Sequence, residues 1–281
     1  MDLIPSDSFY AALAVYEPPF TRLSPAMYYA CAERFIDAIR QGSSPWAVTF
    51  DTFDNGEPIA PAVLHDVGCI VRIIAEHMST HYLALAMWTS ASASGYRPSV
   101  LSTARHLVRS RRFGSYVEML NVEARFERLV AKGDDPDALT VEGEGLFDQG
   151  RLALAVETLQ RALSLPSSNF QWEHSCQLHL GMSLLKLGRT REARCLFEDL
   201  SQSGVYKADE MLADMLRTAD PSSAQQHAYT ASHYGRLEMF SRLAEMELLG
   251  VGSTDSDGRS PEERRLWATE WSRLANPRVE L

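Results

Sequence analysis

One spacing of small residues recurs three times in this chain, and it constrains the fold more than any other feature. In each case a glycine follows a small or aliphatic residue by four positions and precedes an alanine by nine. The three occurrences are Ala91–Gly95–Ala104, Leu200–Gly204–Ala213 and Ala231–Gly235–Ala244.

This spacing predicts pairs of antiparallel helices. A glycine ends a helix cheaply because it adopts the left-handed capping conformation without a Cβ penalty. An alanine nine residues later leaves room for a neighbouring helix at roughly 8–10 Å between axes. A single pair cannot bury its own apolar face, so such pairs are expected in arrays in which each pair covers the next.

A second pattern overlaps the first and occurs twice with identical offsets. It is formed by Gly143, Leu146, Gly150, Ala155, Leu159 and Ala162, and again by Gly181, Leu184, Gly188, Ala193, Phe197 and Leu200. Residues 136–165 and 174–200 therefore resemble the tetratricopeptide repeat. The usual tryptophan is replaced by Leu139 and Gln177, and the closing proline, Pro166, comes one position early.

The C-terminal third is more similar to the Sel1-like relative of that family. "FSRLAEMELLGVG" followed by "SPEERRLWATEWSRLA" matches its helix, glycine loop and second helix. Ser260 is the predicted N-cap of the last helix, with Pro261 at its first position and Glu263 completing a capping box. Trp271 and Leu274 are expected to seal this last pair.

The resemblance extends from Ala62 to Ala275 and implies an all-α fold, a right-handed α-solenoid of tetratricopeptide/Sel1-like helix hairpins with an irregular N-terminal cap. We expect two regions: residues 1–60, irregular with one helix, and residues 61–281, the repeat domain. The one N-terminal helix is predicted to begin after an N-cap at Ser24, with Pro25 at its first position, and to end at Gly42.

The charge balance disfavours nucleic acid as a partner. The chain carries a formal net charge of −10 over 281 residues, whereas binding to a phosphate backbone needs clustered Lys and Arg. The one basic cluster comprises Arg105, Arg109, Arg111 and Arg112, and we interpret it as a solvated helix end rather than an anion patch or localisation signal. An RNA-binding helical-repeat protein is therefore the disfavoured alternative.

The cysteines and the N-terminus bear on localisation. Cys31, Cys69, Cys176 and Cys195 contain no CxxC pair, and the last three lie in apolar helical patterns typical of small buried thiols in a reducing compartment. The longest apolar run, "VGCIVRIIA", is interrupted by Arg72 and is too short for a membrane span. "MDLIPSDSFY" resembles neither a signal peptide nor a transit segment. We expect an intracellular, cytoplasmic protein, or a mitochondrial one if the N-terminus is incomplete.

The sequence contains no constellation typical of catalysis, and we expect no cofactor. His77 and His81 have the i, i+4 spacing of a metal pair, but no third ligand is evident, so we interpret them as structural or surface histidines. "GEGLFDQG" lacks the Lys-Ser/Thr ending of a phosphate loop. An enzyme, or an enzyme subunit, with a site in residues 1–60 remains the alternative. Zinc bound by His77 and His81 would support that alternative.

The tetratricopeptide resemblance implies a binding groove on the inner helix of each pair. Chaperone-binding members clamp a terminal carboxylate there with Lys and Asn. The inner positions of this chain hold no basic residue: Asp137, Thr140, Glu144, Phe147, Ser175, Leu178, Met182 and Leu185. A carboxylate clamp is therefore disfavoured.

The same positions predict an apolar groove with an acidic edge. It is formed by Glu144, Phe147, Leu178, Met182 and Leu185, and it suits a hydrophobic or basic segment of a partner protein. The equally weighted alternative is that Leu178, Met182 and Leu185 pack against another helix of the same chain. The predicted function is a protein-interaction scaffold or assembly adaptor, with a mitochondrial assembly or translation-associated factor of the same fold as a variant.

Overall fold

The computed structural model describes residues 4–15, 20, 22–49, 59–166, 169–250 and 259–276. In these ranges the chain forms fourteen α-helices and one short 3₁₀ helix, with no β-strand. Contacts between Cα atoms divide it into two compact units. Unit 1 comprises Met1–Gly145 with Leu165–Ser167, and unit 2 comprises Leu146–Ser164 with Ser168–Leu281. The division falls inside helix α7 (Pro136–Asp148).

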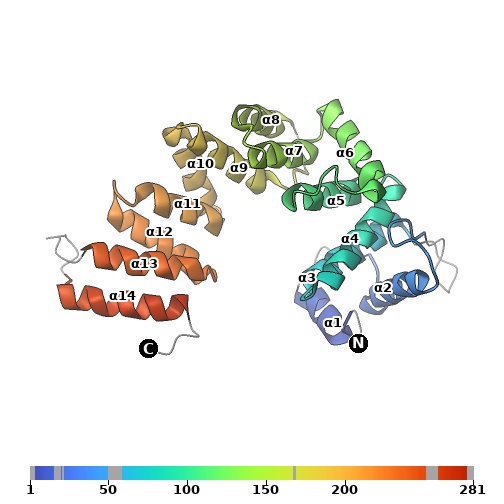
Figure 1. Cartoon of the computed structure of the whole chain (residues 1–281), viewed down its shortest axis with the longest axis horizontal. Helices are drawn as coiled ribbons and strands as arrows, with labels where there is room; N and C mark the ends of the chain where they lie inside the picture. Colours follow the sequence, from blue (N-terminus) through green and yellow to red (C-terminus); the bar gives the residue numbers. More distant parts are fainter. Residues whose placement is uncertain are drawn as a thin grey trace. The chain divides into compact units, whose positions relative to one another are not determined.

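Unit 1 begins with four helices around a common apolar core, followed by further helices that lead into α7 (Figure 1). Its elements before α7 are α1 (Ser6–Val15), α2 (Pro25–Arg40), α3 (Pro61–Ile73), α4 (Met78–Ala93), α5 (Arg97–Arg109), η1 (Val117–Met119) and α6 (Leu120–Lys132).

The N-terminal region contains two described helices where the sequence predicted one. The expected helix, α2, begins after Ser24, whose side chain accepts a hydrogen bond from the Met27 N–H at 3.4 Å. The additional helix is α1. Fully buried Phe9 and Phe35 join residues of α3 and α4 in a single core cluster. The two helices are therefore part of the core of unit 1. Residues 50–58 of this region lie outside the described part of the chain.

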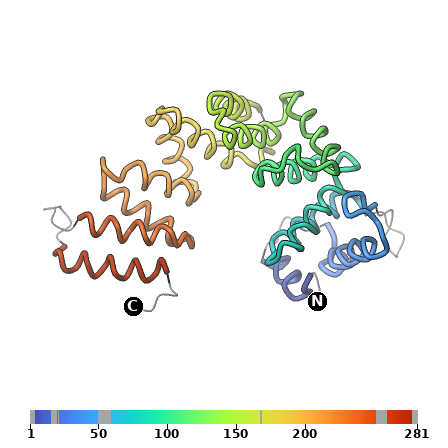
Figure 2. The backbone as a smooth tube through the Cα atoms, in the orientation of Figure 1, coloured from blue at the N-terminus to red at the C-terminus, as the bar shows by residue number. Residues whose placement is uncertain are grey.

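From α8 to α14, each helix of unit 2 packs against the next in the chain, most plainly from α11 to α14 (Figure 2). Besides the end of α7, its elements are α8 (Leu152–Ser164), α9 (Glu173–Lys186), α10 (Thr190–Gln202), α11 (Tyr206–Leu216), α12 (Pro221–His233), α13 (Leu237–Gly250) and α14 (Pro261–Ala275).

The three glycines of the first repeated spacing lie between paired helices, as predicted. Gly95, Gly204 and Gly235 have φ angles of +79°, +77° and +82°, in the left-handed region that glycine adopts without strain. The alanines nine residues later are buried, and Ala104 and Ala213 are both 0% exposed. The prediction of capping glycines is confirmed, and the burial of the alanines agrees with the predicted helix contacts.

The hairpin of α9 and α10 shows why its small residues are required. A Cβ atom added to Gly181 would lie 2.6 Å from Cε1 of Phe197 on the facing helix. Ala193 is 0% exposed, and Gly188 turns the chain with a φ of +78°. The two helices approach so closely that a side chain at position 181 would displace the phenylalanine ring.

The last helix begins as the sequence predicts. The Ser260 hydroxyl accepts from the Glu263 N–H at 3.2 Å, and the Glu263 carboxylate accepts from the Ser260 N–H at 2.7 Å. Trp271 stacks on Phe240 of α13 with ring centroids 5.8 Å apart. The expectation for Leu274 was wrong, since this side chain remains 42% exposed.

The cysteines are all free, and their environments differ. Cys31 and Cys176 are buried, and Cys69 is half-buried. Cys195 is exposed on α10, so the prediction that it is a buried thiol was wrong: its neighbour Ala193 occupies the crossing instead. Within the described ranges, no helix combines the length and the apolar character needed to cross a membrane.

Candidate interaction surfaces and polar clusters

Glu144, expected at the acidic edge of the groove, is buried and ion-paired within unit 1. Its side chain is 1% exposed and accepts hydrogen bonds from two arginines of α5. Arg105 donates through Nη2 at 2.5 Å and Nε at 3.1 Å, while Arg109 donates through Nε at 3.0 Å and Nη2 at 3.2 Å. The structure thus differs from the expectation of an open acidic edge, because two cations cover this carboxylate.

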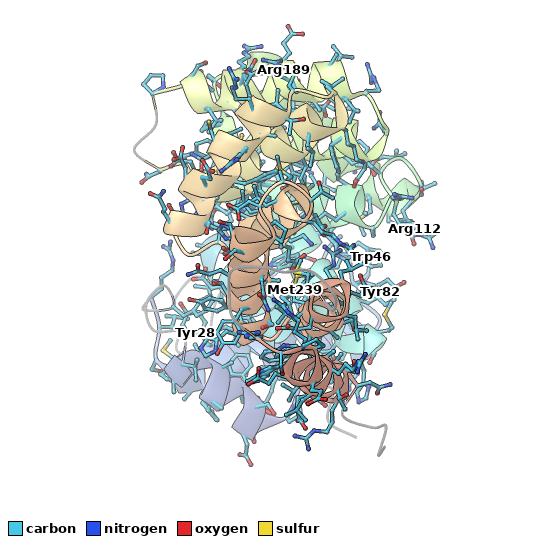
Figure 3. All side chains as sticks on the ribbon, turned by 90° about the vertical axis from the view of Figure 1, so that its left-hand side faces the viewer. Tyr28, Trp46, Tyr82, Arg112, Arg189 and Met239 are labelled. Carbon is cyan, nitrogen blue, oxygen red and sulfur yellow. The ribbon has the colours of Figure 1, made fainter. Side chains whose placement is uncertain are left out.

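These ion pairs also correct the interpretation of the basic cluster as a purely solvated helix end. The Arg105 side chain is only 15% exposed and serves as a structural partner of Glu144. Arg111 and Arg112, beyond the end of α5, are exposed, and Arg112 projects away from the ribbon (Figure 3). Two residues of the cluster, Arg105 and Arg109, therefore pair with Glu144, although Arg109 remains 53% exposed, and the other two are solvated.

The remaining predicted groove residues belong to unit 2, and the structure brings Phe147 against α9. The Phe147 ring contacts the His179 ring edge to face, with centroids 5.8 Å apart. The Lys186 ammonium lies 4.1 Å from the centroid of the same phenyl ring, a cation–π contact. The phenyl ring is thereby held between two side chains of α9.

Leu178, Met182 and Leu185 follow one another along α9 at spacings of four and three residues, which places them on one face of the helix. All three are half-buried, in contrast to Leu180 and Leu184, which are 4% and 2% exposed and belong to the core. Phe147, which contacts His179 and Lys186 of the same helix, is half-buried as well, and we call these four residues the α9 strip.

A second cluster of chemically capable side chains lies around α3 in unit 1. The His65 imidazole is 3.0 Å from the Ser99 hydroxyl through Nδ1, and its Nε2 is 3.5 Å from the Cys69 sulfur. Histidine beside cysteine is the arrangement of a thiol nucleophile with its base. The protonation states therefore decide whether this cluster is reactive.

Burial holds the histidine and the cysteine in their neutral forms. It lowers the pKa of His65 to about 4, with Arg22 acting in the same direction. Burial likewise raises the pKa of the Cys69 thiol to about 12. A nucleophilic cysteine instead needs a lowered pKa and an exposed, electropositive setting. The two side chains are therefore a neutral, partly buried polar contact.

The neighbouring carboxyl group of Asp66 is bound by two residues from the N-terminal region. The Tyr28 hydroxyl donates to it at 3.2 Å, and Arg22 forms an ion pair with it at 3.3 Å (Tyr28 is labelled in Figure 3). Burial raises the pKa of Asp66, outweighing Arg22 and the tyrosine hydrogen bond. Burial and the nearby carboxylate raise the pKa of Tyr28 to about 12. The group ties α2, and the residues just before it, to α3.

His77 and His81 do not form a pair on one helix face. His77 is the N-cap of α4, with extended backbone angles, and only His81 lies inside the helix. The His81 ring is in contact with the Arg72 guanidinium, and its pKa is lowered by partial burial and by that cation. Among the described residues, no group of three or more His, Cys, Asp or Glu is arranged to hold a metal ion.

One feature of the structure was not expected from the sequence. A pocket of about 280 Å³ in unit 1 is lined by three basic side chains of α6, namely Arg125, Arg128 and Lys132. Their spacing of three and four residues in "ARFERLVAK" was the available signal, because it places them on one helix face. The apolar floor of the pocket comes from α5 as well as α6, and the sequence did not reveal that contact.

Comparison with solved structures identifies the type of fold. A Sel1 repeat protein from Oxalobacter formigenes matches with a TM-score of 0.54 and 16% sequence identity, over 88% of this chain and 100% of that one. The antigen c5321 from uropathogenic Escherichia coli, which displays an SLR fold, matches with a TM-score of 0.48 and 14% identity, over 97% of this chain and 60% of that one.

Comparison at the level of sequence is less informative. No protein-family model matches the chain, and none of the curated proteins matches it. At these identities the structural likeness concerns the fold alone, and it agrees with the helix hairpins described above. The chain therefore has an all-α, Sel1-like helical-repeat fold.

Proposed function

We propose that this protein is an interaction scaffold that binds a segment of a partner protein on the α9 strip. The observation that carries the proposal is the strip itself, where Leu178, Met182 and Leu185 remain half-buried while their neighbours on α9 are in the core. Helical-repeat folds commonly present such surfaces to extended or helical segments of other proteins. Because fold alone does not specify function, the proposal rests on the strip.

The chemistry of the strip favours an apolar partner segment. Glu144, the acidic residue expected beside it, is neutralised by two arginines and offers no free charge to a basic partner. The polar groups beside Phe147 are instead His179 and Lys186. Of the two partner chemistries expected from the sequence, the structure supports the hydrophobic one, such as an amphipathic helix with anchors three and four residues apart.

The experiment compares partner capture by the wild-type chain with capture by a Met182→Glu, Leu185→Glu double variant. Both side chains are half-buried, so the charges should interrupt the strip while the core leucines of α9 are unchanged. The matched control is Leu154→Glu with Leu187→Glu, which adds two charges at leucines that are 43% and 42% exposed. All chains must first show cooperative thermal unfolding.

Affinity purification from the native organism with mass spectrometry is expected to yield partners that the strip variant loses and the control retains. A segment of the identified partner should then bind the purified wild-type chain and bind the strip variant more weakly. Identical partner sets for all three chains would contradict the proposal, and so would equal losses in the strip variant and the control.

A further inference from the structure

The pocket on α6 combines an apolar floor with a cationic rim. Val100 of α5 and Leu129 of α6 lie at its base, and its volume is about 280 Å³. Val100 is 2% exposed and belongs to the core, and Leu129 is half-buried. Gly95 lines the side nearest the N-terminus of α5, where the helix dipole adds a partial positive charge.

Arg97 also lines this pocket, but its charge is already compensated. Its guanidinium donates to Asp135 at 2.6 and 2.7 Å and to Asp137 at 2.8 Å. Burial would raise the pKa of Asp135, but hydrogen bonds from Arg97 and from the Ala138 N–H outweigh it, and the pKa is lowered. These carboxylates are thus committed to Arg97 and to the start of α7.

The cations on α6 have no such partners. Among the described residues, Arg125, Arg128 and Lys132 form no ion pair. Arg125 donates one hydrogen bond to the Ala93 carbonyl at 3.2 Å, and Arg128 donates one to the Ala124 carbonyl at 3.1 Å. An arginine has five N–H donors, so most of the donors remain available to a ligand.

The residues that line the pocket, taken with the two carboxylates paired to Arg97, have a positive net charge. Arg97 with Asp135 and Asp137 contributes +1 − 2 = −1, and the three cations of α6 contribute +3, which leaves +2. The whole chain carries −10. A concentrated positive site on an acidic protein suits a compact anion, whereas a long polyanion would meet repulsion from the rest of the surface.

We propose that this pocket binds a phosphorylated side chain of a partner protein, because a phosphate group is the compact anion that a small, concentrated positive site suits. Arginine forks match the geometry of a phosphate group, and the charge-assisted hydrogen bonds they form are strong. The floor formed by Val100 and Leu129 accommodates the apolar stem that carries such a head group. The site belongs to unit 1 and is independent of the α9 strip, so either proposal can fail without the other.

The first experiment measures binding of fluorescently labelled peptides to the full chain by anisotropy, at low and at physiological ionic strength. Three peptides share a Gly/Ser backbone and carry one phosphoserine, a run of Glu, or no charge. The phosphoserine peptide is expected to bind, with inorganic phosphate competing and salt weakening the complex. Binding of the phosphoserine peptide alone supports the proposal, and equal binding of the Glu peptide would contradict it.

The second experiment assigns the binding to this pocket. Arg128→Gln with Lys132→Gln removes two rim charges and keeps Arg125, which bonds to the end of α4. The matched control, Arg151→Gln with Arg191→Gln, removes two charges from exposed arginines. We expect the pocket variant to bind at least about tenfold more weakly and the control to bind almost as the wild type does.

Three results would overturn the proposal. The first is that the phosphoserine peptide does not bind the wild-type chain, or binds it no more tightly than the Glu peptide does. The second is an equal loss of affinity in the pocket variant and the control, which would indicate unspecific attraction by charge. The third is preferential binding of a single-stranded oligonucleotide that displaces the peptides, which would assign the pocket to nucleic acid. Unchanged thermal unfolding of both variants confirms that the comparison concerns binding.

Discussion

At the scale of single residues, the absence of a side chain at Gly181 permits a close contact between two helices of unit 2. Gly181 faces the Phe197 ring, and Ala193 is completely buried one turn away from it on α10. These positions were identified from spacing in the sequence, because a residue that must be small for steric reasons is recognisable by its type alone. The identity of the facing ring followed only from the packing of the two helices.

Ala193→Leu is predicted to lower the free energy of unfolding by about 1–3 kcal/mol, because a larger side chain overpacks a site that is 0% exposed. The measurement is urea or thermal unfolding followed by circular dichroism. Cys195→Leu, which introduces the same side chain at an exposed position of α10, is the control and should have little effect. Equal stability of the Ala193 variant and the control would argue against a close crossing.

Glu144→Gln is predicted to destabilise the chain by about 1–3 kcal/mol, since it leaves Arg105 and Arg109 without their buried carboxylate. Glu157→Gln, at an exposed position of α8, provides the same chemical change without a buried ion pair. Denaturant unfolding measures the free energy of unfolding of the two variants and tests the predicted difference. If Glu144 were a surface residue of a groove, the two variants would have similar stabilities.

His65 is predicted to make the protein less stable at acidic pH. Burial lowers its pKa to about 4 from 6.5, so between these values the unfolded chain binds a proton that the folded chain does not. Stability is therefore fully present above about pH 6.5 and is lost as pH falls towards 4, by up to about 3 kcal/mol. Comparing unfolding of wild type and His65→Gln from pH 7 to 4.5 isolates this contribution, and parallel curves would contradict it.

At the scale of elements, the sequence predicted two helix N-caps correctly but missed one helix. Ser24 and Ser260 cap α2 and α14 as predicted, because an N-cap depends on contacts within one turn. Helix α1 was missed: it is ten residues long and lies in a proline-containing stretch, so its sequence signal is weak. Burial of Phe9 in the core of unit 1 explains its formation.

Ser260→Ala is predicted to lower the free energy of unfolding by about 1 kcal/mol, because it removes the hydroxyl that accepts from the Glu263 N–H. Ser260→Asp should restore most of the loss, since its carboxylate is a good N-cap. Thermal unfolding of both variants, with amide exchange in α14 as a local readout, tests the prediction. A Ser260→Asp variant as unstable as Ser260→Ala would indicate a cause other than capping.

At the scale of the whole molecule, contacts are concentrated between helices that are neighbours in the chain. The core cluster of unit 1 joins α1 to α4, and a separate cluster in unit 2 joins Ala213, Ala228 and Leu243 of α11, α12 and α13. In a helical-repeat protein, stability is approximately a sum over units and their nearest neighbours. Damage in one core should therefore remain largely local.

Phe35→Ala, in the core of unit 1, is predicted to increase amide exchange in α1 to α4 far more than in α11 to α14. The expected loss of stability is about 3–5 kcal/mol locally, because a fully buried ring leaves a cavity. Hydrogen exchange with mass spectrometry measures both regions in one experiment. A uniform increase along the chain would show that the two units unfold as one.

The amino-acid sequence by itself determined the helical class, the glycines between paired helices, the small residues at crossings and the caps at Ser24 and Ser260. Each of these depends on backbone preference or on contacts within one or two neighbouring helices, which a linear spacing records. The tertiary structure alone decided which charges are buried. Arg105 meets Glu144 across 39 residues and Arg97 meets Asp135 across 38, and exposure follows from such long-range pairing. For the same reason, the sequence predicted an open groove at Glu144, where the structure has an internal ion pair. It also did not reveal the cationic pocket on α6.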